Sequence, residues 1–373
     1  MDCPNLPVFD LGSWSETLIA PLEGRRYPFG GTFELTERCN FNCVHCYINQ
    51  PAGGNPVKAN ELTTAQVKQI LDQVAEAGCM FLTLTGGEPL LRPDFPEIYR
   101  HARQQGLIIS VYTNGALITP QIAELFEEVT PRVVDISLYG SSAETYQKVT
   151  RRPSSFDQVF QGIELLRERN VPFSLKTMIL TINYQEFEAI RNIADQFGVK
   201  FRYDGLLWPR LDGGQKTSKY QLPPDELINI EFSDPSIYPL WIELAESHQG
   251  EMCRHKNVYN CGIGRHSFHI DAAGNLSGCI AVRRPSLNLL EMSFAEGWEK
   301  LGLFYKQERH LDTPCRTCTL NNLCNQCPGW SQAVFDDNET PVRLLCDLAY
   351  LRAEKVNNLE LSEEKIEEMM YYE

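Results

Sequence analysis

GTFELTERCNFNCVHC, residues 31–46, joins a short apolar run to three closely spaced cysteines. The run at its start, GTFELT, is apolar and β-branched, which is typical of a strand. Cys39, Cys43 and Cys46 follow it, and the next cysteine is Cys79. Structural zinc and ordinary iron–sulfur clusters take four protein ligands, so a set of three leaves one coordination position open. An open position is typical of a catalytic metal site.

The strand pattern of residues 31–36 recurs along the chain in alternation with amphipathic stretches. TTAQVKQILDQVAEAG at 63–78, for example, has apolar residues three and four positions apart, as a helix does. Six strand–helix units in series predict a parallel sheet with right-handed crossovers. Because eight units close a full barrel, six predict an α/β fold of the partial (β/α)6 TIM-like barrel type, open on one side. The other five predicted strands are 80–86, 107–115, 133–140, 173–180 and 200–207.

Polar or glycine-rich motifs directly follow four of these predicted strands. The three-cysteine stretch follows the first, TGGEP (85–89) the second, TNG (113–115) the third and SLYG (137–140) the fourth. Functional sites in parallel α/β folds form at the C-terminal ends of strands, so we expect the four motifs on one rim of the sheet.

Cysteines dominate the C-terminal part of the chain, where the strand–helix alternation stops. The sequence has 13 cysteines, and in a reducing cytosol clustered thiols hold metal more often than they form disulfides. Their spacing leaves little room for a large apolar core, so metal would supply folding free energy there. The predicted parts are a lead-in (1–30), the barrel (31–220), a Pro-rich bridge (221–252), a small cysteine-rich iron–sulfur domain (253–350) and an acidic C-terminal helix (351–373).

Charge and hydropathy exclude two classes of partner. The formal net charge of −15 argues against nucleic acid, which requires a basic face. No run of eighteen apolar residues is present, so no membrane span is predicted. The first residues lack a basic and then apolar signal pattern, so the expected location is the cytoplasm.

The C-x3-C-x2-C spacing, followed by the aromatic Tyr47, resembles the cluster loop of the radical S-adenosylmethionine (SAM) enzymes. The resemblance implies that Cys39, Cys43 and Cys46 hold a [4Fe-4S] cluster whose open iron binds SAM. A zinc knuckle completed by a distant ligand is the alternative interpretation of the loop. The implied SAM contacts are the GGEP element (Gly86, Gly87, Glu88 and Pro89) for the amino group, Ser137 for the ribose, Asn114 on the same rim, and Lys176 for the carboxylate.

A second cysteine set has the pattern C-x2-C-x5-C-x2-C and resembles the SPASM domain of radical SAM enzymes that modify peptides and proteins. The resemblance implies two auxiliary [4Fe-4S] clusters, hence three in all. Two residues, where the family often has three, precede the last cysteine of the run, so the pairing of ligands stays open. Two zinc sites are the alternative. The implied ligands are Cys261, Cys279 and Cys327, with Cys253 as the fourth, for the first auxiliary cluster, and Cys315, Cys318, Cys324 and Cys346 for the second. Without Cys253, the first auxiliary cluster has an open iron.

The resemblance also implies the reaction. A flavodoxin- or ferredoxin-type donor supplies one electron, SAM is cleaved to methionine and a 5′-deoxyadenosyl radical, and the radical takes a hydrogen atom from the substrate. The expected substrate is a ribosomal peptide, with a carbon–carbon or thioether cross-link as a typical product. A separate leader-peptide-binding protein is a further expected partner. The alternatives are a formylglycine-forming sulfatase-type maturase, a small-molecule dehydrogenase and, in a different class, a non-catalytic iron–sulfur or zinc scaffold.

Polar residues at the end of the sixth predicted strand are candidates for acid–base work on the substrate. They are Tyr203 and Asp204 on the strand, with Arg210 and Asp212 in the WPRLDGG stretch that follows. Each could orient a substrate backbone or take a proton. The alternative interpretation is that they are ordinary polar residues of a strand end and a loop.

Overall fold

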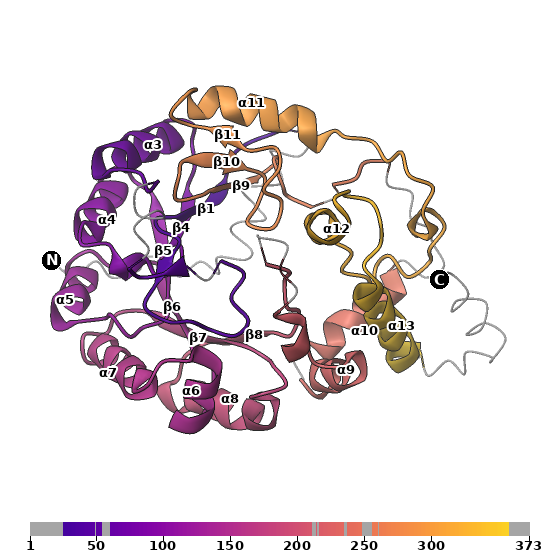
Figure 1. Cartoon of the computed structure of the whole chain (residues 1–373), viewed down its shortest axis with the longest axis horizontal. Coiled ribbons are helices and arrows are strands. Elements are labelled where there is room, and N and C mark those ends of the chain that lie inside the picture. Colours follow the sequence, from indigo (N-terminus) through magenta and orange to yellow (C-terminus); the bar gives the residue numbers. More distant parts are fainter. Residues whose placement is uncertain are drawn as a thin grey trace, which may run out of the picture.

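The computed structural model describes residues 25–48, 50–53, 60–210, 214, 216–234, 237–247, 256–259 and 261–357 of the chain. Its central feature is a sheet with the strand order β11-β10-β9-β1-β4-β5-β6-β7-β8 (Figure 1). Strands β1 and β4 to β8 run parallel to their neighbours, which confirms the predicted six-stranded partial barrel. They span Gly30–Glu34, Phe81–Thr85, Ile108–Thr113, Val133–Ser137, Phe173–Met178 and Phe201–Asp204.

Helices that follow the strands form an outer arc around the sheet (Figure 1). Hydroxyl side chains cap several of their N-termini: the oxygens of Thr63, Thr119 and Ser142 each accept a backbone N–H of the first turn. Such caps explain why α3, α5 and α6 begin where the preceding loops end. The helices of the arc are α3 (Thr64–Glu76), α4 (Phe95–Gln104), α5 (Pro120–Glu128), α6 (Ala143–Thr150), α7 (Ser155–Glu168) and α8 (Phe187–Phe197).

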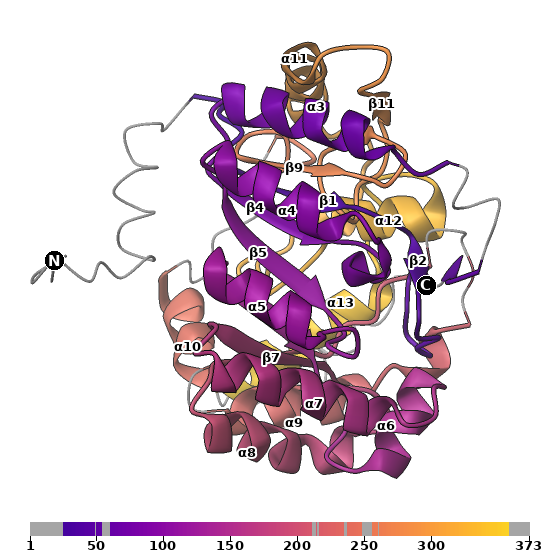
Figure 2. The same cartoon turned by 90° about the vertical axis from the view of Figure 1, so that its left-hand side faces the viewer.

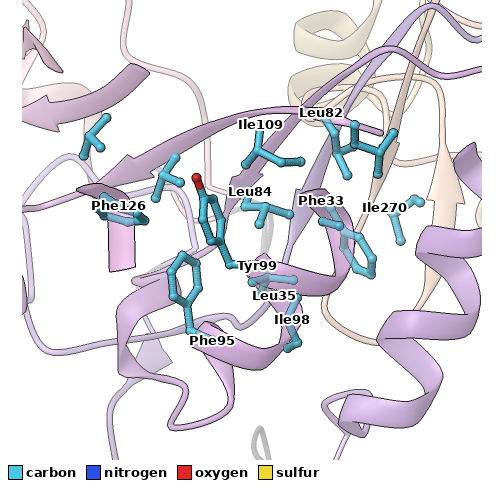
Figure 3. Packing of buried hydrophobic residues seen from close by; sticks show 14 of the residues in the cluster. Phe33, Leu35, Leu82, Leu84, Phe95, Ile98, Tyr99, Ile109, Phe126 and Ile270 are labelled. Carbon is cyan, nitrogen blue, oxygen red and sulfur yellow. The ribbon is translucent and has the colours of Figure 1, made fainter. Parts of the chain in front are cut away.

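The layer between the sheet and these helices is filled by apolar side chains (Figure 3). Phe33, Leu84 and Ile109 come from the adjacent strands β1, β4 and β5 and are fully buried, as are Phe95 and Tyr99 of α4. Burying each side chain of this size contributes about 1.5–3 kcal/mol. The strands whose C-terminal ends carry the predicted motifs are therefore fixed from behind by a close-packed core.

The sheet continues beyond the barrel with three strands from the cysteine-rich region. β9 (Ser267–Ile270) pairs in parallel with β1, and β10 (Asn275–Ser277) and β11 (Leu287–Asn288) follow antiparallel. The expectation of little apolar core in residues 253–350 is wrong for these elements, because Phe268 and Ile270 belong to the same core as the barrel. A partial barrel leaves one edge of β1 unpaired, and β9 satisfies that edge.

Helix α11 (Phe294–Tyr305) covers this extension of the sheet and lies beside α3 in both views (Figures 1 and 2). Its residues Phe294, Trp298 and Leu301 are buried in the common core. The domain boundaries predicted from the sequence remain predictions, but the first half of the cysteine-rich region packs as part of the barrel.

The predicted bridge, residues 221–252, contains helices α9 (Pro224–Ser233) and α10 (Tyr238–Ser247). They pack against α13, Arg343–Asn357, so the C-terminal helix begins before the predicted boundary at residue 351. Residues 358–373 of that predicted helix and residues 1–24 of the lead-in lie outside the described residues. The shorter elements are β2 (Arg38–Cys39), β3 (Gln50–Pro51), α12 (Pro328–Phe335) and the 3-10 turns Pro89–Leu91, Tyr184–Glu186, Ser218–Tyr220 and Pro314–Arg316.

Among the residues that the structure describes, no helix combines the length and the apolar character needed to cross a membrane.

Candidate functional site

A cavity of about 1010 Å³ lies at the C-terminal ends of the parallel strands. The four motifs predicted to share this rim all contribute to its wall, so that prediction is confirmed. The three-cysteine loop lines the cavity, as do residues of β8, α9, α10 and the cysteine-rich region. The lining includes Cys39, Cys43, Cys46, Gly86, Gly87, Tyr112, Asn114, Ser137, Lys176, Tyr203, Asp204, Trp208, Trp241, Ile280 and Asn325.

The three-cysteine loop is fixed to the C-terminal end of α6. The backbone N–H groups of Asn42 and Val44 donate to the carbonyl oxygens of Thr150 and Val149, at 3.0 and 2.9 Å. These carbonyls have no partner within the helix, so the loop satisfies them. Burial raises the pKa of the Cys39 thiol to about 12, and the charge of Glu88 adds to the shift. Thiols raised in this way stay protonated until a metal displaces the proton.

The loop after β4 packs backbone against backbone on the segment that leads into the cysteines. Gly87 N donates to the carbonyl of Thr36 at 2.6 Å, and Glu88 N donates to that of Arg38 at 2.9 Å. A Cβ atom at Gly86 would overlap the Thr36 carbonyl oxygen, and one at Gly87 would overlap that of Arg38. Gly86 also has a φ of +147°, which favours glycine. The glycines are therefore required for the loop to lie at the cavity wall.

Glu88 itself is fully buried behind this loop, and the structure does not place it among the cavity-lining residues. Its carboxylate accepts hydrogen bonds from Leu90 N at 3.0 Å, Thr113 Oγ1 at 2.8 Å and Asn114 N at 2.7 Å. Burial raises the pKa of this carboxyl to about 7. Glu88 thus ties the β4 loop to the end of β5, whereas the predicted contact was with a ligand amino group. Pro89 is likewise buried and starts a 3-10 turn.

Asn114 and Ser137 present polar side chains to the cavity beside the cysteine loop. Asn114 Nδ2 donates to Asn40 Oδ1 at 2.8 Å and lies 3.7 Å from Cys39 Sγ. Ser137 is the last residue of β6, and its carbonyl accepts from the Tyr146 hydroxyl at 3.0 Å. Both residues line the cavity, and their contacts with SAM stay a prediction.

Lys176 belongs to a charged group on the inner wall of the barrel. Its Nζ lies 3.5 Å from the centre of the Tyr112 ring and 4.0 Å from Asp135 Oδ2. Arg202 donates to the same carboxylate and to Tyr112 Oη at 3.2 Å. Burial lowers the pKa of Lys176 to about 8, although the charge of Asp135 opposes the shift. Two cations share one buried carboxylate, which leaves an excess positive charge at this wall.

Tyr112, Asp135 and Arg202 were not among the residues predicted for the site. They come from β5, β6 and β8, and Lys176 lies on β7 between the last two. Tyr112 is in register with Asp135, and Lys176 with Arg202. The sequence feature that could have identified them is a polar residue in the middle of an otherwise apolar strand. Such a residue indicates a functional position that faces into the barrel.

The structure describes three of the four residues predicted for acid–base work. Tyr203 and Asp204 line the cavity at the end of β8, and Asp204 Oδ1 accepts from Leu206 N at 2.8 Å. Burial raises the pKa of the Asp204 carboxyl. Asp212 lies outside the described residues. Arg210 donates to the Cys46 carbonyl at 3.2 Å and so fastens the loop after β8 to the cysteine loop.

The described C-terminal cysteines form the two groups that the resemblance implies. Burial raises the pKa of Cys279 to about 11, with smaller contributions from the neighbouring Cys327 and Cys261. The second group surrounds Cys324. Burial raises the pKa of Cys324 to about 12, and the neighbouring Cys346, Cys315 and Cys318 add to this shift. Cys253, the proposed fourth ligand of the first group, lies outside the described residues.

Residues next to both C-terminal cysteine groups also line the cavity. They are Ile280, the neighbour of Cys279, and Asn325, the neighbour of Cys324. The same cavity therefore includes the N-terminal cysteine set and one sequence neighbour of each C-terminal group.

The donor sets fit iron–sulfur clusters better than single metal ions. Within the described ranges, no three His, Cys, Asp or Glu side chains converge closely enough to hold one ion. Zinc would need its sulfur ligands at about 2.3 Å, converging on one point. A four-iron cluster distributes its cysteines over separate irons, so it accepts thiols that are near one another without converging.

Comparisons with known proteins agree with this geometry. The sequence model of the radical SAM superfamily matches residues 33–196. The AdoMet-dependent heme synthase of Methanosarcina barkeri is 29% identical over 325 residues, which cover 82% of this chain and 92% of that protein. The mycofactocin maturase MftC of Mycobacterium tuberculosis is 30% identical over 311 residues, which cover 79% of this chain and 76% of that protein.

Among solved structures, Streptococcus suis SuiB bound to the precursor peptide SuiA superposes with a TM-score of 0.67 at 14% identity. The match covers 92% of this chain and 83% of SuiB, so it includes the cysteine-rich C-terminal region as well as the barrel. At this identity the likeness shows the shared fold.

Proposed function

The chain belongs to the radical SAM superfamily with a SPASM-type C-terminal region, and from this premise we propose that it is a peptide or protein maturase. The observation that carries the proposal is a single cavity lined both by the three cysteines of the N-terminal loop and by Ile280 and Asn325, the sequence neighbours of Cys279 and Cys324. A substrate bound there would contact the radical source on one side and the auxiliary groups on the other. The expected result is an oxidative modification such as a carbon–carbon or thioether cross-link.

The residues at the N-terminal cysteine set suit SAM and its cluster. Cys39, Cys43 and Cys46 would hold the cluster, where bound SAM supplies the hydrogen-abstracting radical. Gly86 and Gly87 bring bare backbone to the cavity wall, which allows close approach of a ligand. The remaining proposed contacts are Ser137 to the ribose, Asn114 beside the cluster loop and Lys176 to the carboxylate.

The C-terminal cysteine groups would hold two auxiliary [4Fe-4S] clusters, and these would accept the electron left by substrate oxidation. The proposed ligand sets are the two groups that the structure brings together, with Cys253 completing the first. A flavodoxin- or ferredoxin-type protein would donate the electron that starts the reaction. A separate protein that binds a leader peptide remains a possible further partner.

The charges of the cavity favour a peptide over a polyanionic substrate. Three cations line it among the described residues, and each already contacts a carboxylate: Lys176 and Arg202 contact Asp135, and Arg191 contacts Asp234 at 2.8 Å. Asp204 adds a negative charge at the substrate end. Because Lys176 and Arg202 share one carboxylate, the cavity offers one excess positive charge, enough for a single ligand carboxylate. A ligand with several carboxylates would have to break these pairs, which is unfavourable in a partly desolvated site.

The relatives support two substrate classes. MftC is named a maturase, and SuiB is described with a precursor peptide, which favours the peptide proposal. A tetrapyrrole is the second candidate, because the heme synthase relative matches over 92% of its own length. The pairing of the cavity cations supports the peptide proposal.

The test compares the two classes directly. The reconstituted enzyme is incubated without oxygen with SAM and dithionite. The added substrate is either a mixed synthetic library of short peptides rich in Cys, Ser and aromatic residues, or Fe-coproporphyrin III, the tetrapyrrole in the name of a second Methanosarcina barkeri relative. We expect the peptides to stimulate 5′-deoxyadenosine formation and to lose hydrogen, as mass spectrometry would detect. Conversion of Fe-coproporphyrin III alone, or of neither, would contradict the peptide proposal.

Lys176 gives a pH-dependent prediction for SAM binding. Its lowered pKa, about 8, means that the ammonium charge is lost as pH rises through that value. If Lys176 pairs with the SAM carboxylate, affinity should fall roughly tenfold at one pH unit above that pKa. The Lys176→Arg variant keeps its charge, so the ratio of the two dissociation constants, measured by calorimetry from pH 7 to 9.5, isolates the effect from the titration of SAM itself. A constant ratio would remove Lys176 from the SAM site.

Asp204 is predicted to act on the substrate and not on SAM. Replacing it by asparagine should lower peptide turnover by about 100-fold, the contribution of a positioned base, and leave substrate-free 5′-deoxyadenosine formation within about twofold. Because burial raises its pKa, wild-type turnover should fall as the solution is acidified through that raised value. Asp195→Asn, at another position of the cavity wall, is the matched control. Full turnover by Asp204→Asn would exclude the base.

A further inference from the structure

Glu34, the last residue of β1, is fully buried and forms a two-pronged ion pair with Arg283. Arg283 Nη2 donates to Glu34 Oε1 at 2.8 Å, and Nη1 donates to Oε2 at 3.0 Å. The two residues are 249 positions apart in the sequence. Paired hydrogen bonds of this type fix both distance and orientation, since the planar guanidinium matches the carboxylate.

Each partner of this pair also holds a loop that carries a cysteine set. On the barrel side, the hydroxyl of Tyr47, the neighbour of Cys46, donates to Glu34 Oε1 at 3.1 Å. On the other side, Arg283 Nε donates to the carbonyl of Ile280, the neighbour of Cys279, at 2.9 Å. A chain of three hydrogen-bonded side chains therefore connects the two loops across the strand β1.

His269 of β9 completes the environment of Glu34. Its Nε2 lies 3.6 Å from Glu34 Oε2, and its Nδ1 is 2.6 Å from Thr32 Oγ1. Burial alone would raise the pKa of Glu34, but His269 and Arg283 together lower it to about 2. The Glu34 carboxylate is therefore charged at any pH at which the enzyme works. The positive charge of Arg283 neutralises it locally.

We propose that Glu34 and Arg283 are positioning residues that hold the Cys279 loop at a fixed separation from the three-cysteine loop, so that both cysteine sets face one substrate. Ile280, which Arg283 holds through its backbone, lines the same cavity as Cys46. The proposal rests on the proposed function in taking this cavity as the substrate site. Neither residue contacts the reacting atoms, because both act through Tyr47 and Ile280.

The first test is hydrogen exchange on the reconstituted full-length chain, measured by mass spectrometry without oxygen. In Glu34→Gln and in Arg283→Met, exchange in residues 44–48 and 279–283 should become roughly tenfold faster, as expected when one charge-assisted contact is lost. Strand β6, residues 133–137, should not change, which separates a local effect from general destabilisation. Arg284→Met is the matched control, because Arg284 is exposed and forms a surface ion pair with Asp336 at 2.7 Å.

A double variant, Glu34→Gln with Arg283→Met, keeps the test valid if single variants fold poorly. A single change leaves one buried charge without its partner, whereas the double change removes both. We expect the double variant to recover its iron content but to keep the fast exchange in both loops. Exchange at the wild-type rate in residues 279–283 of the folded double variant would overturn the proposal.

The coupling of SAM cleavage to peptide modification gives a second readout. The amount of 5′-deoxyadenosine formed per modified peptide should rise roughly tenfold in the variants, because the radical is still made but the second loop no longer holds the substrate against it. Unchanged coupling together with unchanged exchange would refute the positioning role. Fast exchange in the absence of any peptide turnover, by contrast, would refute the peptide assignment and leave the linkage between the loops intact.

Discussion

Simultaneous replacement of Cys39, Cys43 and Cys46 by alanine is expected to reduce 5′-deoxyadenosine formation to the level of the enzyme-free reaction. These thiols line the cavity, and no other cysteine of the described residues contributes to its lining. Iron content should fall by roughly a third, if each of the three cysteine sets holds one four-iron cluster. The measurement is anaerobic reconstitution, iron analysis and chromatography of the nucleoside after addition of SAM and dithionite.

Cys79→Ala is the control for this variant. Cys79 is buried in the apolar core between α3 and β4 and belongs to neither C-terminal group, so its loss should cost about 1 kcal/mol of stability and no activity. If the triple variant still forms 5′-deoxyadenosine, the assignment of the catalytic cluster is wrong. If wild-type protein binds zinc tightly and retains little iron, the scaffold interpretation replaces the enzymatic one.

Gly86→Ala is expected to lower both stability and SAM affinity. The new Cβ would overlap the Thr36 carbonyl oxygen, and the φ of +147° is unfavourable for alanine. The steric and conformational costs together predict a loss of about 3 kcal/mol in the free energy of unfolding. Because relief of the overlap moves the β4 loop away from the cysteine loop, SAM should bind at least about tenfold more weakly.

The Gly106→Ala variant separates the conformational cost from the steric cost. Gly106 also has a positive φ, +84°, but a Cβ there meets no atom within 4 Å, and the residue lies in an exposed turn. This control should lose about 1 kcal/mol of stability and no SAM affinity. Denaturant unfolding and calorimetry would measure both quantities. Equal behaviour of the two variants would show that the contact with Thr36 does not matter.

Local patterns in the sequence predicted the barrel and most of the rim. The strands Phe81–Thr85 and Val133–Ser137 were found because each is a short apolar run followed at once by a turn motif. Motif order then placed Gly86, Asn114 and Ser137 on one edge, because parallel strands end on the same side. Such inferences need only residues that are close together in the sequence, and the structure confirms them.

Contacts between distant residues were beyond the reach of the same patterns. Glu34 reads as an ordinary polar residue of a strand, and only the fold brings it to Arg283. The sequence SFHI at 267–270 is too short to be recognised as a strand that joins β1. Glu88 has the type and position of a ligand contact, but the motif alone could not predict its three hydrogen bonds inside the protein.

The pairing of β9 with β1 has a consequence for the synthesis of the protein. β1 leaves the ribosome early, yet the strand that covers its free edge is translated more than two hundred residues later. During that interval the nascent barrel presents an exposed, pairing-competent edge, which is the typical starting point of aggregation. The cysteine-rich region therefore acts as a C-terminal closure for the fold, and a chain truncated after the sixth barrel strand should be recovered mainly as insoluble protein.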